Sequence, residues 1–294
     1  MNVSILNTVV LPAGLALIML GLGLHLTTTD FRRALTARKA VLVALLCQVV
    51  LMPLLCVALV EAAGAEPTVA VGMLVLAASP GGTLAALYSH LAGGEVALNI
   101  TLTAINSVLS VITLPLVVWA ATSHYLGTGD YIGLQPSAIS TIIAMVLLPV
   151  ALGMFVRHRW PGPAGRLDRP VRVLSLLVLV VVIAGSLWQN RDRLVDTIIV
   201  VGPLVTVFCV LNLSVGYWLP SVLRLSRGQA ISTSMEIGVH NSALAITIAV
   251  SPLFLNDPAI GLAPGLYSLF GLIIAGAAAY FLSRRTQPVQ ASVT

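Results

Sequence analysis

Charged side chains are scarce in this chain, and their scarcity sets its class. Asp, Glu, Lys and Arg together make up 9% of the 294 residues and aromatic residues 5%, whereas hydrophobic residues make up 58%. A soluble domain of this length has no core large enough to bury so much apolar surface. The mean hydropathy of +1.03 therefore predicts an all-α protein that crosses the membrane several times.

Cysteine is also rare. The chain has 3 cysteines, and each lies within an apolar stretch: Cys47, Cys56 and Cys209. An odd number of scattered cysteines gives neither a disulfide framework nor the spacing of a metal site. We interpret them as small buried side chains.

Apolar stretches fill the rest of the sequence. Hydropathy predicts about nine transmembrane helices, at residues 5–26, 39–62, 68–91, 95–121, 137–157, 171–188, 196–219, 229–252 and 259–283. The first stretch has no basic residues before its apolar run, so we expect a retained helix and not a signal peptide. We expect one transmembrane domain followed by a cytoplasmic tail at residues 286–294.

The positions of the basic residues predict the orientation. With the N-terminus outside, thirteen of the 15 Lys and Arg residues fall on the cytoplasmic side, and Arg191 and Arg193 fall outside. We therefore expect an outside N-terminus and a cytoplasmic C-terminus, in the plasma or inner membrane of the cell. The net charge of +5 is explained by this bias, so the expected partners are lipid and a small solute, not a nucleic acid. The oligomeric state is left open.

Glu236 is the one carboxylate in the middle of a predicted span. The other acidic residues fall near span ends or in connections. An ionisable group at bilayer depth is unfavourable unless it faces a protein-lined cavity and has a partner, so Glu236 is a candidate functional residue.

Two predicted spans are interrupted near their middle. The third contains Ser79-Pro80-Gly81-Gly82-Thr83, and the eighth contains Glu236 to Ser242 with Gly238 among polar side chains. Proline removes a backbone donor and glycine permits an unwound backbone, which is tolerated in a membrane where it lines a cavity. One interruption in each half predicts inverted repeats, the first at about residues 1–122 and the second at about 137–285.

The broken ends predict two kinds of ligand. Free carbonyl groups beside a carboxylate favour a small hard cation, and free amides favour an anion. We therefore expect sodium at Glu236 and the carbonyl groups of Ile237 and Val239. The candidate contacts for a substrate carboxylate lie at the two breaks, and they are Thr83, Asn241, Gly82 and Ser242.

Further polar side chains lie inside apolar spans, namely Gln48, Asn99, Thr103 and Asn106. Each is open to two interpretations, an interhelical hydrogen bond or a ligand role. Asn99, Thr103 and Asn106 share one helical face because they are spaced at i, i+4 and i+7. His240 is open to three interpretations: a neutral cation ligand, a proton carrier or a hydrogen-bonding group.

Several motifs together resemble the bile acid:sodium symporter family. They are Gly21-Leu22-Gly23-Leu24 followed by Asp30-Phe31, Gln48 with Pro53, Pro80-Gly81-Gly82-Thr83, Gly94-Glu95-Val96-Ala97-Leu98, and Glu236-x-Gly238-x-His240-Asn241-Ser242. Their order and spacing cover nearly the whole chain. The resemblance implies a bacterial member in a nine-helix form, with a panel domain and a core domain in which two broken helices cross.

The resemblance also implies sodium sites. One maps onto Gln48, Glu236, Ile237, Val239 and His240, although the family often has Gln at the position of His240. A second uses the same Glu236 with Asn99 and Thr103. In that second site the family's Ser-Asn pair is replaced here by Ala85-Ala86, which removes two side-chain oxygens.

The function we expect is sodium-coupled symport of an organic anion, bile-acid-like or a small carboxylate, by alternating access. Two alternatives are a proton-coupled carrier that uses Glu236 and His240, and a channel or non-transporting sensor. We do not expect an enzyme, because intramembrane proteolysis needs either two carboxylates or a His-Glu-x-x-His cluster.

Overall fold

The computed structural model describes residues 11–82, 84–127, 140–141, 143–167, 170–171, 173–174, 177, 180–181 and 194–284. This part of the chain is almost entirely helical. Its β pairing is limited to one isolated bridge between Gly81 and His240. The predicted all-α class is confirmed.

The helices follow the apolar stretches of the sequence. The first half contains α2 (Leu11–His25), α3 (Thr28–Thr36), α4 (Arg38–Leu46), the π-helical segment η2 (Cys47–Leu51), α5 (Met52–Ala62), α6 (Pro67–Ala78), α7 (Ala85–Leu91) and α8 (Val96–Tyr125). The second half contains the π-helical segment η3 (Ile143–Leu147), α10 (Leu148–Arg159), α12 (Leu194–Val222), α13 (Arg227–Gly238), α14 (Ser242–Val250) and α15 (Leu262–Arg284).

Four continuous helical stretches among the described residues are long and apolar enough to cross a membrane: Arg38–Ala62, Val96–Tyr125, Ile198–Val222 and Leu262–Arg284. A fifth is possible if Pro12–His25 and Thr28–Thr36, bent by 73°, form one span. These stretches support a multi-pass membrane protein. Most of the predicted span at 171–188 and the whole predicted tail at 286–294 lie outside the described residues.

Two helices break where the sequence predicts an interruption. One helix ends at Ala78 and resumes at Ala85, and the other ends at Gly238 and resumes at Ser242. The unwound segments pair with each other, since the Gly82 amide donates to the Val239 carbonyl at 2.6 Å and the Asn241 amide donates to the Pro80 carbonyl at 2.8 Å. Each break therefore satisfies backbone groups of the other, as an unwound segment away from water requires.

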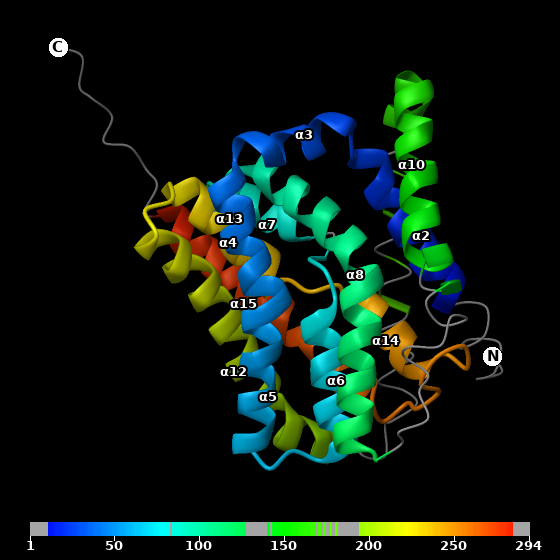
Figure 1. Ribbon diagram of the computed structural model, residues 1–294, viewed down its shortest axis with the longest axis vertical. Helices are drawn as coiled ribbons and strands as arrows, with labels where there is room; N and C mark the ends of the chain where they lie inside the picture. Colours follow the sequence, from blue (N-terminus) through cyan, green and yellow to red (C-terminus); the bar gives the residue numbers. More distant parts are fainter. Residues whose placement is uncertain are drawn as a thin grey trace.

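The contact between the two unwound segments, residues 79–82 and 239–241, is called the crossing below. The helices pack in two groups around it (Figure 1). In one group α2 packs against α10; in the other, α12 packs against both α13 and α15, and α6 packs against α8. The contact between α2 and α10 is close, because a Cβ added at Gly153 would lie 2.5 Å from the Leu20 carbonyl oxygen. Small residues permit such close helix contacts in membranes.

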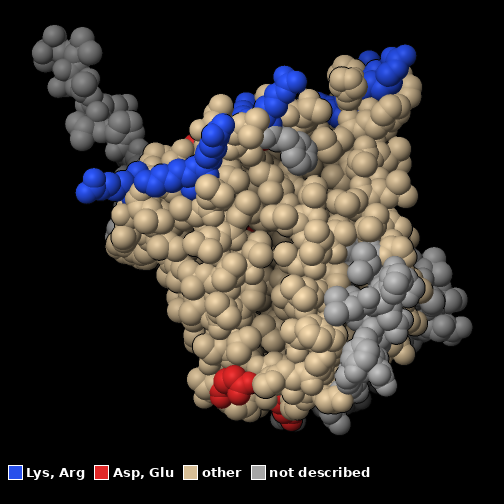
Figure 2. Space-filling view, viewed as in Figure 1, with Lys and Arg blue, Asp and Glu red and all other residues tan. Residues whose placement is uncertain are grey.

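Charge is segregated along the molecule. Figure 2 shows Lys and Arg side chains at the end that holds α3 and a group of Asp and Glu side chains at the opposite end, while the buried Asp30 lies on α3 at the basic end. The face between them shows almost no charged side chain. Exposed apolar side chains of the described residues include Leu42, Ile112 and Ile273. An apolar band between two charged ends is the surface expected of a protein surrounded by lipid.

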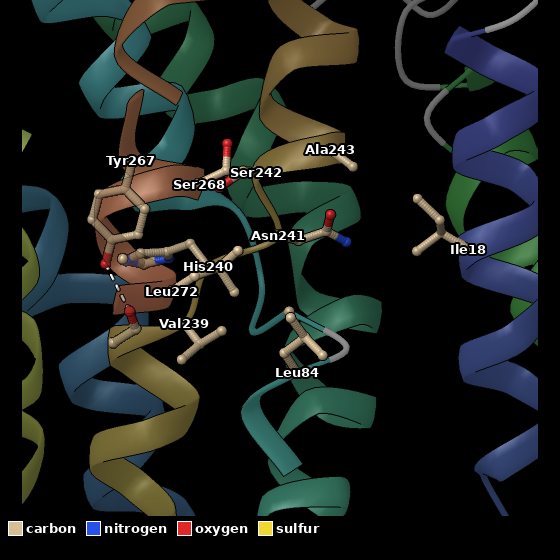
Figure 3. A pocket seen from close by; sticks show the side chains of 13 residues that line it. Ile18, Leu84, Val239, His240, Asn241, Ser242, Ala243, Tyr267, Ser268 and Leu272 are labelled. Carbon is tan, nitrogen blue, oxygen red and sulfur yellow. Dashed lines mark hydrogen bonds between the residues drawn. The ribbon is translucent and has the colours of Figure 1, made fainter. Parts of the chain in front are cut away.

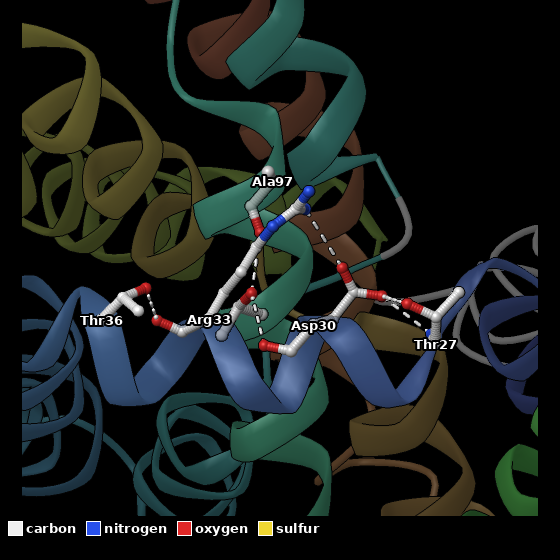
Figure 4. A network of polar contacts seen from close by, with 6 residues as sticks. Thr27, Asp30, Arg33, Thr36 and Ala97 are labelled. Atoms are coloured by element: carbon white, nitrogen blue, oxygen red, sulfur yellow. Dashed lines mark hydrogen bonds and ion pairs between the residues drawn. The ribbon is translucent and has the colours of Figure 1, made fainter.

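The short helix α3 is fixed by a buried acid (Figure 4). The Asp30 carboxylate accepts hydrogen bonds from the Thr27 amide at 2.8 Å and the Thr27 hydroxyl at 2.7 Å, and it lies 3.4 Å from Arg33 Nη1. The Asp30 carbonyl accepts from the Thr101 hydroxyl at 3.0 Å. These contacts cap α3 and attach it to α8 at the basic end.

Candidate functional site

Glu236 lies in the last turn of α13 and is fully buried, with 0% of its surface exposed. Its carboxylate accepts hydrogen bonds from Thr103 Oγ1 at 2.5 Å and Asn106 Nδ2 at 3.1 Å, both on α8. The polar face predicted on this helix is thus turned toward the acid. Both donors are neutral, and the ion pairs found among the described residues do not include Glu236.

The first break presses directly against this carboxylate. A Cβ built on Gly81 would overlap the carboxyl carbon and both carboxylate oxygens of Glu236. Glycine is therefore required at this position by close approach and not by backbone conformation. The structure thus brings Glu236 and the Pro-Gly-Gly segment together, as the sequence predicted.

Gln48 reaches the same break from a neighbouring helix. It lies in η2, a π-helical segment of the kind that is frequent at functional sites. Its Nε2 donates to the Ser79 carbonyl at 3.0 Å and to the Ala77 carbonyl at 3.3 Å, while its buried Oε1 has no hydrogen-bond partner among the described residues. Gln48 therefore binds the end of α6 and leaves one oxygen free.

His240 is held on several sides. Its Nδ1 lies 3.3 Å from the Ser79 carbonyl oxygen and its Nε2 lies 2.9 Å from Asn212 Nδ2. The ring stacks on Phe208 with centroids 5.9 Å apart and an interplanar angle of 5°, and it meets Tyr267 edge-on. Because the Asn212 amide donates, Nε2 is the acceptor and the Nδ1 proton faces Ser79.

Tyr267 contacts both His240 and the second break, and the sequence analysis did not identify this residue. Its hydroxyl donates to the Gly238 carbonyl at 2.8 Å, and Asn212 Nδ2 lies 3.4 Å from the same hydroxyl. The available signal was a phenol inside the last predicted span, where a buried hydroxyl must find a partner. It ties α15 to the second break.

Asn99 and Thr103 have different surroundings. Thr103 contacts Glu236, whereas Asn99 Nδ2 donates to the Ser232 carbonyl at 3.1 Å, one helical turn before the acid. The Ser232 hydroxyl lies 3.0 Å from that of Ser89. The Asn99 Oδ1 atom is buried and has no hydrogen-bond partner in the part of the chain that the structure describes. The structure thus brings one of the two residues into contact with Glu236.

A cavity of about 50 Å³ adjoins the crossing. The candidate substrate residues Gly82, Asn241 and Ser242 line it, together with Tyr267 and with Ile18 from α2. Figure 3 shows the Asn241 side chain projecting toward Ile18 across the open space. The remaining candidate, Thr83, lies outside the described residues.

The electrostatics of this cavity suit an anion. Helix α14 begins at Ser242, and the Asn241 side chain caps it by accepting from the Leu244 amide at 3.0 Å. The N-terminal end of a helix carries a partial positive charge and free amides, which favour a carboxylate. Apolar residues such as Val239 and Leu84 form much of the remaining wall.

Comparison with known proteins decides the family. The sequence profile of the Sodium Bile acid symporter family matches residues 12–197. This chain belongs to that family. Its relatives are transporters and not enzymes, and sodium is the coupling ion of the family.

Curated relatives of this symporter family member come from animals, plants and bacteria. The mouse ileal sodium/bile acid cotransporter is 29% identical over 280 residues, covering 92% of this chain and 79% of its own length. A probable chloroplastic sodium/metabolite cotransporter of Arabidopsis thaliana is 28% identical, covering 94% and 67%. An uncharacterised sodium-dependent transporter of Bacillus subtilis, YocS, is 22% identical, covering 94% and 84%.

In this family member, residues from opposite halves of the sequence meet at one crossing. Gln48 and Gly81 come from the first half, and Glu236 and His240 come from the second. Such an arrangement, with a buried carboxylate, free amide oxygens and a helix N-terminus within one crossing, can hold a cation and an anion close together.

Proposed function

We propose that this protein is a secondary active transporter that couples sodium to the movement of an organic anion by alternating access. The observation that carries the proposal is the fully buried Glu236 carboxylate, which rests against the first break and has neutral donors as its partners. A buried charge without an opposite charge is strongly destabilising. A bound cation at this position would neutralise it.

The proposed sodium site comprises Gln48, Glu236, Ile237, Val239 and His240. It is supported by the free Gln48 Oε1 atom and by the end of α13 at Gly238, where carbonyl groups lose their helical partners. The Val239 carbonyl accepts from the Gly82 amide and keeps a second lone pair. For His240 to act as a ligand, one of its two ring contacts must open.

A second sodium site at Asn99 and Thr103 has less support. The Thr103 hydroxyl gives its proton to Glu236, and Ala85 brings no side-chain oxygen to the buried start of α7. The free Asn99 Oδ1 atom is the feature that favours it.

The organic anion would dock in the cavity at the start of α14. Asn241 and Ser242 would meet its carboxylate, with Gly82 on the opposing break. Thr83, next to Gly82 in the sequence, is the fourth proposed contact and lies outside the described residues. The apolar wall formed by Ile18, Leu84 and Leu272 suits a hydrocarbon body. Both a bile-acid-like solute and a small carboxylate have this chemistry.

Alternating access requires two parts that move against each other. We propose that α2 and α10 belong to a panel and that α4 to α8 and α12 to α15 form the core, in two inverted repeats and nine spans. Ile18 on α2 faces the core across the anion cavity, which supports a cavity between the two parts. The charge segregation in Figure 2 supports a cytoplasmic basic end, with the N-terminus outside, in the inner membrane.

The experiment that tests this proposal is uptake in proteoliposomes. A thermal-shift screen of organic acids, in sodium and in potassium, would select the solute. We expect saturable uptake that requires an inward sodium gradient and stops when potassium replaces sodium. Absence of sodium dependence for every organic anion that binds would refute sodium coupling.

Proton coupling is the second candidate function. It is favoured by the presence of two titratable side chains, Glu236 and His240, buried at the same crossing. A proton on Glu236 would neutralise the buried charge as a cation would. Uptake driven by a pH gradient in sodium-free buffer, and lost in Glu236→Gln, would establish it; uptake insensitive to that substitution would exclude it.

A further inference from the structure

A second cavity, of about 10 Å³, meets the first break at Pro80 and has room for about one water molecule or one small ion. Its walls come from η2 and α5, from the end of α6 and from α8, and it shares no lining residue with the anion cavity. Pro80 lines the second cavity and Gly82 lines the first. The two cavities therefore meet the first break at different residues.

Two of its lining side chains are amides whose orientation is set by chemistry. The Gln48 NH2 group donates to two carbonyl oxygens, and the Asn106 NH2 group donates to the Glu236 carboxylate. Carbonyl and carboxylate oxygens accept hydrogen bonds, so neither amide can be turned round without losing these contacts. The oxygens Gln48 Oε1 and Asn106 Oδ1 are consequently left free.

Both free oxygens are deeply buried. Gln48 is 4% exposed and Asn106 is 3% exposed, and neither oxygen has a partner within the described protein. A buried acceptor without a partner is unfavourable by roughly the strength of a hydrogen bond. Two of them beside one cavity indicate a ligand that is attracted to oxygen.

The charge around this cavity selects a cation. Helix α6 ends at Ala78, which lines the cavity, and the C-terminal end of a helix carries a partial negative charge. Glu236 lies directly behind Asn106, at the other end of its hydrogen bond. The lining, which is drawn from the described residues, contains no basic side chain. An organic anion would find no free donor here.

The cavity follows α8 away from the basic end of the molecule. Its lining continues from Asn106 to Thr113 and Val117, toward the end of α8 where the Tyr125 hydroxyl donates to Glu61 at 2.8 Å. This is the end where Asp and Glu gather in Figure 2. Negative charge at an entrance raises the local concentration of cations.

We propose that this second cavity is a separate entrance for the coupling cation, in which Gln48 Oε1 and Asn106 Oδ1 replace water ligands of a monovalent ion on its way to Glu236. The organic anion uses the other cavity. This inference rests on the proposed function and adds to it a path and a residue, Asn106, that the proposed sodium site does not contain.

The Asn106 amide has two functions in this proposal: its NH2 group donates to Glu236, and its oxygen binds the cation. The first test separates them. The melting temperature of the purified protein is measured while sodium chloride replaces choline chloride at constant ionic strength. We expect Asn106→Leu to raise the half-saturating sodium concentration about ten-fold or more, and Asn106→Asp, which keeps an oxygen at the cavity, to leave it unchanged or lower it. If Asn106 serves Glu236 as a donor alone, both variants lose sodium binding and the inference is overturned.

The second test blocks the cavity without removing a ligand. Leu109 lines the cavity, whereas Ile112, on the same helix, is 72% exposed and serves as the matched control position. We expect Leu109→Phe to slow sodium-driven uptake about ten-fold or more and to leave the thermal shift caused by the anion unchanged. Ile112→Phe should behave as wild type in both measurements. Equal uptake in both variants would mean that the cavity holds water alone, and the inference would fail.

The wild-type response keeps the two proposals apart. A wild-type protein whose melting temperature and uptake ignore sodium would refute the proposed function, and the cation entrance with it. A normal wild-type response, together with unchanged sodium dependence in Asn106→Leu and Leu109→Phe, would refute the entrance alone. If Asn106→Leu does not fold, Asn106→Asp and Leu109→Phe decide the matter.

Discussion

Replacing Glu236 with glutamine removes one charge and almost no volume, so it isolates the electrostatic part of cation binding. The fold can accept the change. The glutamine oxygen can take the hydrogen bond from Asn106, while its NH2 group faces Thr103, whose hydroxyl proton can turn to the Asn99 carbonyl at 3.1 Å. Since the variant also removes a buried charge, we expect its melting temperature in sodium-free buffer to equal or exceed that of the wild type.

The effect on cation binding is expected to be large. A carboxylate charge about 4 Å from a cation contributes about 4 kcal/mol at an effective dielectric constant of about 20. Since about 1.4 kcal/mol corresponds to a factor of ten, Glu236→Gln should weaken sodium binding by about three orders of magnitude. A half-saturating concentration in the millimolar range would move to the molar range.

The assay measures two quantities in the same preparation. Sodium-dependent thermal shift reports binding, and uptake into proteoliposomes under an inward sodium gradient reports transport. Glu95→Gln is the matched control, because Glu95 is exposed at the start of α8, at the basic end and away from the acidic end of the molecule. A Glu236→Gln protein that is folded and still shows the wild-type sodium response would refute the assignment of Glu236 as the cation's principal ligand.

Three further substitutions test the surroundings of the site. Gly81→Ala places a Cβ against the Glu236 carboxylate, so uptake should be lost and the melting temperature lowered, whereas Gly162→Ala, which meets no atom within 4 Å, should change neither. Tyr267→Phe removes the hydroxyl that donates to Gly238 at 2.8 Å, and a loss of about 1 kcal/mol should weaken anion binding about five-fold in a titration. Ser226→Ala removes the N-cap of α13 and should lower stability by about 1 kcal/mol in thermal unfolding, with the half-saturating sodium concentration unchanged.

Local signals in the sequence were sufficient to predict where the helices break. Pro80 with Gly81 and Gly82 interrupts one span, and Gly238 among polar residues interrupts the other, because these residues weaken a helix by themselves. The polar face of α8 was also predictable, since helical periodicity alone places Thr103 and Asn106 on one side. The structure confirms both breaks and turns that face toward Glu236.

Contacts between distant segments were not predictable in the same way. The residues that contact His240 are Phe208 and Asn212 from α12 and Tyr267 from α15, and their spacing in the sequence does not predict these contacts. The π-helical segment that contains Gln48 and the 73° bend before α3 likewise depend on packing. Periodicity reports which face of a helix is polar, but not which partner meets that face.

The geometry of the crossing explains how a cation and an anion can be coupled. The Glu236 carboxylate lies against the break at Gly81, so a cation bound to it would contact that break. The same break holds the other one through two backbone hydrogen bonds, from the Gly82 amide to Val239 and from the Asn241 amide to Pro80. Asn241 lines the anion cavity. Fixing one break would therefore fix the position of Asn241, the residue proposed to contact the anion.

This coupling has a quantitative consequence. Coupling energies between sites are typically about 1–3 kcal/mol, so saturating sodium should raise the affinity for the anion about 5- to 150-fold. Because linkage is reciprocal, a saturating anion must raise the affinity for sodium by the same factor. Both factors can be measured by calorimetric titration of one preparation, with the fixed partner present or absent. Unequal factors, or an anion affinity that does not respond to sodium, would show that the crossing does not transmit binding from one site to the other.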